Sequence, residues 1–131
     1  MTNEAQQYAE TISEEVSSLE IVLRGDEADG YADALGRLEM TDREDAEGDY
    51  FGLWATETLL DVSVRVDLRG SDYGTTIVML RTVGGPRCEI IRDSHDGDAV
   101  EVLSWSGSEM GRVRLTVPNF VAKLEDLFVL A

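Results

Sequence analysis

A regular alternation of apolar and polar side chains constrains this chain more than any other feature. Residues 60–69 read LDVSVRVDLR, with leucine or valine at every second position. Because successive side chains of an extended strand point to opposite faces of a sheet, this pattern predicts a strand with one buried face. The alternation returns in RVRLTV at residues 112–117. The core positions predicted on these two strands are Val64, Val66, Val113 and Leu115.

Turn residues divide residues 60–117 into about five strands. GSDYG follows the first strand, the GGP turn precedes RCEIIRD, and Asp96-Gly97 is a signal for a tight turn that needs a positive φ. Each connection is too short to hold a crossover helix, so neighbouring strands must run antiparallel. The sequence therefore predicts an antiparallel β-meander of about five strands.

Helical periodicity flanks this meander on both sides. Apolar residues spaced three and four apart predict an amphipathic helix over residues 4–24 that ends near Gly25, and they are Tyr8, Ile12, Val16, Leu19 and Leu23. A closing helix is predicted over residues 119–130, with Asn119 as its N-cap. Its apolar face holds Phe120, Val121, Leu124, Leu127 and Phe128. The expected fold class is α+β, with an N-terminal and a C-terminal helix packed on the sheet.

Two segments before the meander are less regular. Tyr31, Leu35 and Leu38 favour a short second helix between residues 26 and 38, with Asp29 and Asp33 four positions apart on its exposed side. Residues 50–58, YFGLWATET, are compatible with an extra edge strand or with a packed connection, and the pattern does not decide between them.

The length of 131 residues and the hydrophobic content of 43% fit one domain with a single core. We expect residues 1–131 to form that domain, with an acidic, helical and loop-rich half at 1–59 and the sheet plus closing helix at 60–131. The N-terminus has no basic segment followed by an apolar core, and the apolar runs are too short to cross a bilayer. A cytoplasmic protein is expected.

The reactive side chains argue against an enzyme. Cys88 and His95 are the only cysteine and the only histidine, and seven positions along a strand separate them by about 23 Å, too far for a nucleophile and its base. They cannot supply a structural zinc set. Neither acidic glycine-containing loop places a carboxylate at the first position of an EF-hand. We therefore expect no catalytic residues, no metal and no cofactor.

The negative charge is concentrated in the first half of the chain. Of the net charge of −16, residues 1–61 contribute −14, from 17 acidic and three basic residues. Residues 62–131 contribute only −2, from 10 acidic and eight basic residues. Nucleic acids and anionic membranes are polyanions, so direct binding to either is disfavoured. A basic protein is the natural partner.

The candidate partner-binding residues are carboxylates of this first half. Carboxylates four apart on a helix lie about 6 Å apart, and those two apart on a strand lie about 6.6 Å apart, so both spacings resemble successive phosphates of DNA. The run TDREDAEGDY at residues 41–50 alone supplies five carboxylates. The candidates are Glu10, Glu14, Asp26, Glu27, Asp29, Asp33, Asp42, Glu44, Asp45, Glu47 and Asp49.

In size, acidity and compactness, the whole chain resembles small acidic phage proteins that inhibit restriction or CRISPR enzymes by occupying a DNA-binding cleft. No shared motif accompanies the resemblance, so it transfers no functional residue. It implies a non-enzymatic DNA mimic, an anti-CRISPR or anti-restriction inhibitor that displaces DNA from the Arg and Lys side chains of a nucleic-acid-binding complex. The inhibitor is expected to be a monomer or a homodimer.

Two alternatives stay open. Type III secretion chaperones are also small, acidic α+β proteins, usually dimeric, and are loosely similar in their order of helix, meander and helix, which would make this protein a cytosolic chaperone or adaptor. The acidity also fits a housekeeping domain from a high-salt proteome, and Lys123 is the only lysine among eleven basic residues. An exposed apolar groove or a dimer favours the chaperone, and a continuous carboxylate surface on a monomer favours the mimic.

Overall fold

The computed structural model describes residues 3–40, 49–69, 72–82 and 86–128. Three helices precede the sheet and one follows it: α1 (Glu4–Arg24), α2 (Tyr31–Arg37), α3 (Tyr50–Thr58) and α4 (Pro118–Phe128). The strands are β1 (Asp61–Arg69), β2 (Asp72–Thr82), β3 (Arg87–Asp93), β4 (Ala99–Ser106) and β5 (Glu109–Thr116). Each strand pairs antiparallel with the next, in the order β1-β2-β3-β4-β5. The predicted α+β meander is confirmed.

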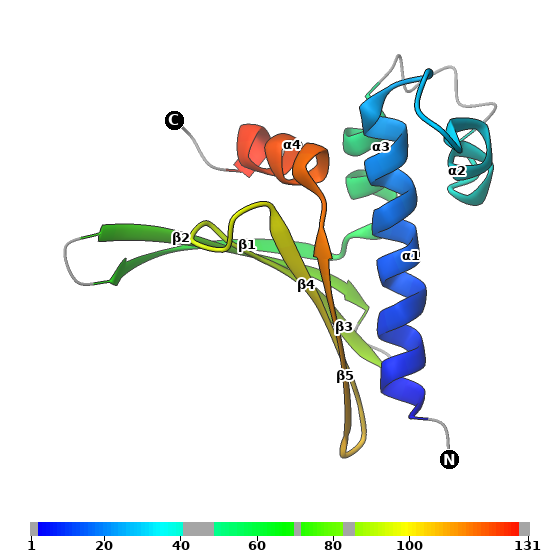
Figure 1. Cartoon of the computed structure of the whole chain (residues 1–131). Helices are drawn as coiled ribbons and strands as arrows, with labels where there is room; N and C mark the ends of the chain where they lie inside the picture. Colours follow the sequence, from blue (N-terminus) through cyan, green and yellow to red (C-terminus); the bar gives the residue numbers. More distant parts are fainter. Residues whose placement is uncertain (1–2, 41–48, 70–71, 83–85, 129–131) are drawn as a thin grey trace.

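The helices lie on one side of a strongly bent sheet, as Figure 1 shows. Helix α1 packs on β4 and β5, α4 packs on α1 and β4, and α2 and α3 pack on α1. The other face of the described strands carries no helix (Figure 1). The core therefore lies between β2 to β5 on one side and α1, α3 and α4 on the other.

Local signals at both ends explain the predicted bounds of α1, which are confirmed. The side chain of Asn3 accepts a hydrogen bond from the backbone N–H of Gln6 at 3.0 Å and caps the first turn. Gly25 ends the helix at a φ of 114°, a conformation that side chains disfavour. The predicted apolar face is buried at its centre, at Ile12, Val16 and Leu19.

Residues 50–58 form helix α3, so the edge strand considered for them is wrong, and the connection that they make is a helix packed on the core. Asp49 caps this helix by accepting a hydrogen bond from the N–H of Gly52 at 3.0 Å. Phe51 and Trp54, three positions apart, share one helix face and are each 1% exposed. Both rings lie 5.4 Å from the ring of Phe120 between centroids, so α3 and α4 meet through an aromatic cluster.

Helix α4 begins at Pro118, one residue earlier than predicted, and Asn119 does not act as its N-cap. The carboxylate of Glu20 on α1 accepts hydrogen bonds from the backbone N–H groups of Asn119 (3.2 Å) and Phe120 (2.8 Å) and from the Asn119 side chain (2.7 Å). The first N–H groups of a helix have no partner within it and favour a negative charge. Glu20, only 2% exposed, therefore attaches α4 to α1.

The predicted burial of β1 is wrong. Val64 is 45% exposed and Val66 is 66% exposed, although both lie on the same side of the sheet as the helices. Strand β2 pairs with β3 only from Thr76 onward, so the far end of the β1–β2 hairpin extends beyond β3, to the left of the helices in Figure 1. Val113 and Leu115 on β5 are half-buried, and Leu127 of α4, predicted apolar and inward, is 54% exposed.

Candidate functional site

Two of the candidate carboxylates lie on the outer face of α1. Glu10 and Glu14 are exposed and stand one helical turn apart, as the sequence predicted. Together with Val113 and Leu115 of β5 they line a hollow of about 280 Å³. Glu10 accepts only a long hydrogen bond from Gln6, at 3.4 Å. Both carboxylates are therefore available to solvent or to a partner.

A second group of carboxylates surrounds the connection from α1 to α2. Asp26, Asp29 and Asp33 line a hollow of about 410 Å³, and Glu27 is exposed beside them in the sequence. Helix α2 begins only at Tyr31, after Gly30 with a φ of 79°, so Asp29 precedes the helix. The predicted pair of Asp29 and Asp33 on one helix face is therefore not formed.

Of the five remaining candidate carboxylates, only Asp49 lies within the described residues. Asp49 is exposed, but it caps α3 and so has a structural role. The other four candidates, Asp42, Glu44, Asp45 and Glu47, lie outside the described residues. We use the name acidic face for the six described carboxylates without a capping role, which are Glu10, Glu14, Asp26, Glu27, Asp29 and Asp33.

The acidic face contrasts with the sheet in how its charges are paired. In the described part of the chain, none of its six carboxylates forms an ion pair with a basic side chain. Five arginines of the strands have carboxylate partners, in the pairs Arg81–Glu15 (3.1 Å), Arg87–Glu89 (2.9 Å), Arg92–Glu125 (2.9 Å), Arg112–Glu101 (2.6 Å) and Arg114–Asp96 (2.5 Å). The unneutralised charge of the described residues thus concentrates around α1 and α2.

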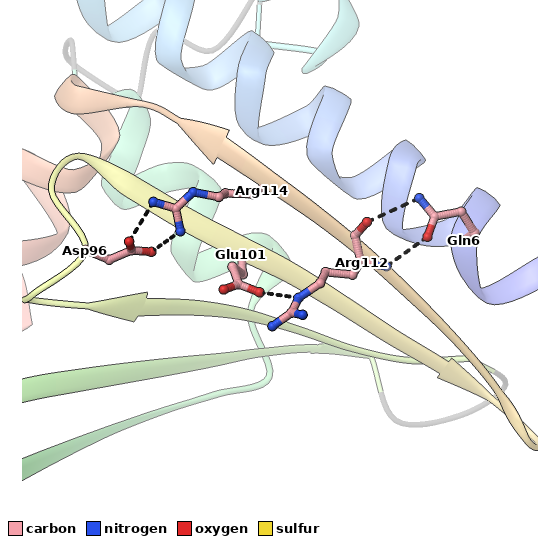
Figure 2. A network of polar contacts seen from close by, with 5 residues as sticks. All are labelled: Gln6, Asp96, Glu101, Arg112 and Arg114. Atoms are coloured by element: carbon pink, nitrogen blue, oxygen red, sulfur yellow. Dashed lines mark hydrogen bonds and ion pairs between the residues drawn. The ribbon is translucent and has the colours of Figure 1, made fainter.

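Figure 2 shows the paired region on β4 and β5, where Arg112 and Arg114 reach across the sheet to acidic side chains. The hydrogen bonds from Arg114 lower the pKa of the Asp96 carboxyl. At the outer edge of β5, the Gln6 side chain of α1 accepts a hydrogen bond from the N–H of Arg112 (2.9 Å) and donates one to its carbonyl oxygen (3.2 Å). Gln6 thus occupies the place that a neighbouring strand would take on the outer edge of β5.

An arginine interrupts the acidic face. Arg37 of α2 donates a hydrogen bond from its Nε to the Ser18 hydroxyl at 2.9 Å and lines a hollow of about 350 Å³ with Glu14. An adjoining cavity of about 470 Å³ also holds Arg81 and Glu15. Burial lowers the pKa of Arg81, but the hydrogen bond and charge of Glu15 more than offset it, so this pKa is raised. The carboxylates therefore form two groups rather than one continuous surface.

The sequence analysis missed a second exposed surface, which we name the overhanging face. It consists of four apolar side chains on the helix side of the β1–β2 hairpin, Val64, Val66, Leu68 and Tyr73, with exposed fractions of 45%, 66%, 70% and 75%. Leu68 and Tyr73 are a cross-strand pair. The available signal was strand length, because the alternating segment at residues 60–69 is ten residues long and RCEIIRD is seven, so part of the first hairpin extends beyond β3.

The only cysteine of the chain is buried. Cys88 is 0% exposed, and its burial raises the pKa of the thiol to about 11, so it is protonated at neutral pH. Within the described residues, no three His, Cys, Asp or Glu side chains are grouped as metal ligands. No helix in that part of the chain has the length and apolar character to span a membrane.

Comparison of the chain with protein-family models, with curated proteins and with solved structures gave no match. The two surfaces are therefore interpreted from their own geometry and charge.

Proposed function

We propose that the protein is a non-enzymatic acidic inhibitor whose acidic face binds a basic nucleic-acid-binding protein in place of DNA. The observation that carries the proposal is a concentration of negative charge: six exposed carboxylates without a basic partner among the described residues lie around α1 and its connection to α2, whereas five strand arginines each have a carboxylate partner. In this proposal the inhibited protein belongs to a CRISPR or restriction complex in the cytoplasm of a bacterial host.

Unpaired like charges oppose folding, so a partner that neutralises them gains free energy on binding. Two unit charges 4 Å apart repel by about 1 kcal/mol even in water. Arginines and lysines of a DNA-binding cleft are placed to neutralise phosphates, and Glu10 and Glu14 on one helix face reproduce a phosphate-like separation of about 6 Å. The acids near the α1–α2 connection extend the negative potential and raise the rate of encounter.

A charge-matched pair of variants tests the proposal. The test variant is Glu10→Gln, Glu14→Gln, Asp29→Asn and Asp33→Asn, which removes four charges from the acidic face. The control variant is Asp61→Asn, Asp98→Asn, Glu109→Gln and Asp126→Asn, which removes four exposed charges elsewhere. Both keep a net charge of −12, the wild-type −16 less four carboxylates, so a difference between them reports position and not total charge.

The measurement is competition with DNA. Immobilised wild-type protein captures partners from the heparin-binding fraction of a bacterial lysate, and the captured protein is then titrated with labelled duplex DNA and each variant. We expect wild type and control to displace DNA at similar concentrations and the test variant to associate roughly tenfold more slowly, with rates falling as salt rises from about 50 to 500 mM. Equal displacement by both variants, or no displacement by wild type, would overturn the proposal. A surface that serves only solvation in high salt gives stability that increases in molar salt and no competition.

Two observations favour a second candidate, the cytosolic chaperone or adaptor. Holding a client needs exposed apolar surface, which the overhanging face supplies, and the described carboxylates form two groups instead of the continuous surface expected of a mimic. In that role the wild-type protein would bind an extended apolar peptide, and the test and control variants would bind it equally. Peptide binding that Val66→Asp abolishes, with no competition against DNA, would replace the inhibitor proposal by this one.

A further inference from the structure

Exposure increases steadily along the β1–β2 hairpin. Near the helices, Val62 and Met79 form a cross-strand pair. Val62 is half-buried and Met79 is 0% exposed. In the next pair, Ile77 is 1% exposed while Val64 is 45% exposed. At the far end, Leu68 and Tyr73 are 70% and 75% exposed. One continuous apolar stripe therefore begins inside the core and runs out of it.

No helix of the described chain covers the outer part of this stripe. The helices that pack on the sheet do so mainly through β4 and β5, and Figure 1 shows the far end of the hairpin reaching away from α1. The largest exposed apolar patch of a soluble protein, at roughly 300 to 600 Å², is often a functional surface. Within the described residues, the overhanging face therefore has no covering layer and is open to another molecule.

The net charge of the β1–β2 hairpin indicates which kind of molecule can bind the overhanging face. Residues 61–82 contain three acidic and three basic residues, a net charge of zero, whereas residues 1–60 contain 16 acidic and three basic residues, a net of −13. A basic partner would bind the first half in preference to this neutral hairpin. The hairpin is also the place where a second copy of this acidic chain can approach with least repulsion.

The exposed area is sufficient for self-association. The exposed fractions of the four side chains amount to roughly 450 Å² per copy, if a fully exposed side chain of these types has about 150 to 220 Å². Pairing of two such faces, with their flanking backbone, buries roughly 1,000 Å² in total, the size at which specific interfaces begin. Two strips of valine, leucine and tyrosine are also self-complementary, as a two-fold interface requires.

We propose that the overhanging face is the homodimer interface of this protein, covered by the same face of a second copy. The two hairpins pack face to face, as the layers of a β-sandwich do, and the acidic faces of the two copies remain exposed. The dimer thus carries two acidic faces. The proposal does not depend on the inhibitor function, because the acidic face and the overhanging face are made of different residues. It competes with the chaperone candidate, whose client would need the overhanging face that the second copy covers.

Sedimentation equilibrium on the full chain, at low and at molar KCl, tests the proposal with two variants of one strand. Val66→Asp places a charge on the overhanging face, and Ser63→Asp places the same charge on the opposite face of β1, at an exposed position. We expect wild type and Ser63→Asp to dimerise, with equal or higher affinity in molar KCl. We expect Val66→Asp to raise the dimer dissociation constant by roughly a hundredfold or more, because each dimer would bury two unpaired carboxylates.

Circular dichroism of each variant verifies that the chain is folded, and the high exposure of Val66 makes loss of fold unexpected. A wild-type protein that stays monomeric would overturn the proposal, as would dimerisation unaffected by Val66→Asp. Loss of the dimer in both variants would also overturn it, since the interface would then involve the β1 edge or the opposite face. The four-site acidic-face variant dimerises normally if the two surfaces are independent.

Discussion

The first and last hairpins of the sheet have the same alternating sequence pattern but different surroundings. In β4, Val100 and Val102 are 0% exposed beneath α1. In β1, Val66 and Leu68 are 66% and 70% exposed. Alternation follows from the geometry of a strand and is satisfied in both places, whereas burial requires a second layer. The comparison teaches that periodicity identifies the side chains that share a face and not whether that face is covered.

The two edge strands of the sheet also differ in whether other parts of the chain cover them. The outer edge of β5 receives side chains from the start of α1, since Gln6 bonds to Arg112 and Asn3 donates to the carbonyl oxygen of Met110 at 3.2 Å. Among the described strands, β1 pairs with β2 alone. Open strand edges are sites of association between chains, so the covered end of the sheet is closed to a partner and the overhanging end is not.

The largest expected difference is in the free energy of unfolding, between a valine-to-aspartate change in β4, beneath α1, and the same change in the exposed part of β1. Val102→Asp should cost about 3 to 5 kcal/mol or more, because it buries an unpaired charge beneath α1. Val66→Asp should cost less than about 1 kcal/mol, because its carboxylate remains in water. Urea unfolding, at chain concentrations where both proteins sediment as monomers, measures the difference. A loss of several kcal/mol in monomeric Val66→Asp would show that the hairpin is covered in solution.

The next largest effect concerns the attachment of α4 at the covered end. Glu20→Ala should lower the free energy of unfolding by about 2 to 4 kcal/mol, because one buried donor of Phe120 and two partly buried donors of Asn119 lose their acceptor. Glu20→Gln keeps an acceptor oxygen of the same size and should cost less. Unfolding curves followed by tryptophan fluorescence report the change through Trp54. Equal stability of Glu20→Ala and wild type would contradict this account of how α4 is held.

A smaller effect probes how closely α1 lies against β5. A Cβ added at Gly111 would lie 2.4 Å from the carbonyl oxygen of Ala5, so Gly111→Ala must displace the helix and should cost about 1 to 3 kcal/mol. Gly36→Ala in α2 is the matched control, since its added Cβ meets no atom within 4 Å. The control should stabilise the protein by about 0.4 to 1 kcal/mol. Equal thermal shifts for both variants would mean that α1 stands farther from β5 than described.

The smallest expected effect is a pH dependence of the stability, which comes from the Arg114–Asp96 ion pair on the face of the sheet without helices. Because Arg114 lowers the pKa of Asp96, the pair stabilises the folded chain fully above the unfolded carboxyl pKa of about 3.9. That contribution is lost as the pH falls through the lower folded pKa. The stability gap between wild type and Asp96→Asn should therefore narrow between about pH 5 and pH 2. Asp126→Asn, which removes an exposed acid, serves as the control, and a gap independent of pH would contradict the assignment.

The parts of the fold that were predicted correctly depend on local signals. Helix α1 has an apolar periodicity, a capping residue and a terminating glycine all within its own segment, and its outward carboxylates Glu10 and Glu14 follow from the same periodicity. The exposure of these two candidate residues was therefore predictable. The short aromatic segment of α3 carries no clear period over nine residues, which is why its helix was not predicted.

The parts that were not predicted depend on contacts between distant positions. Glu20 is separated by about a hundred positions from the helix it caps, and nothing near it in the sequence indicates that role. Val66 alternates as regularly as Val102, and only the extent of α1 and α4 over the sheet decides that one is exposed. Four carboxylates of the acidic run lie outside the described residues, so their contribution to a binding site stays a prediction.

The contact between Gln6 and the edge of β5 also restricts how α1 can move. Gln6 bonds to both the N–H and the carbonyl oxygen of a single residue, Arg112. Along a strand edge, outward N–H and carbonyl groups recur only at every second residue, a repeat of about 6.8 Å. A slide of α1 by less than this distance breaks both hydrogen bonds and restores neither. These two hydrogen bonds therefore favour one position of α1 along β5 and oppose small displacements of the helix along the strand.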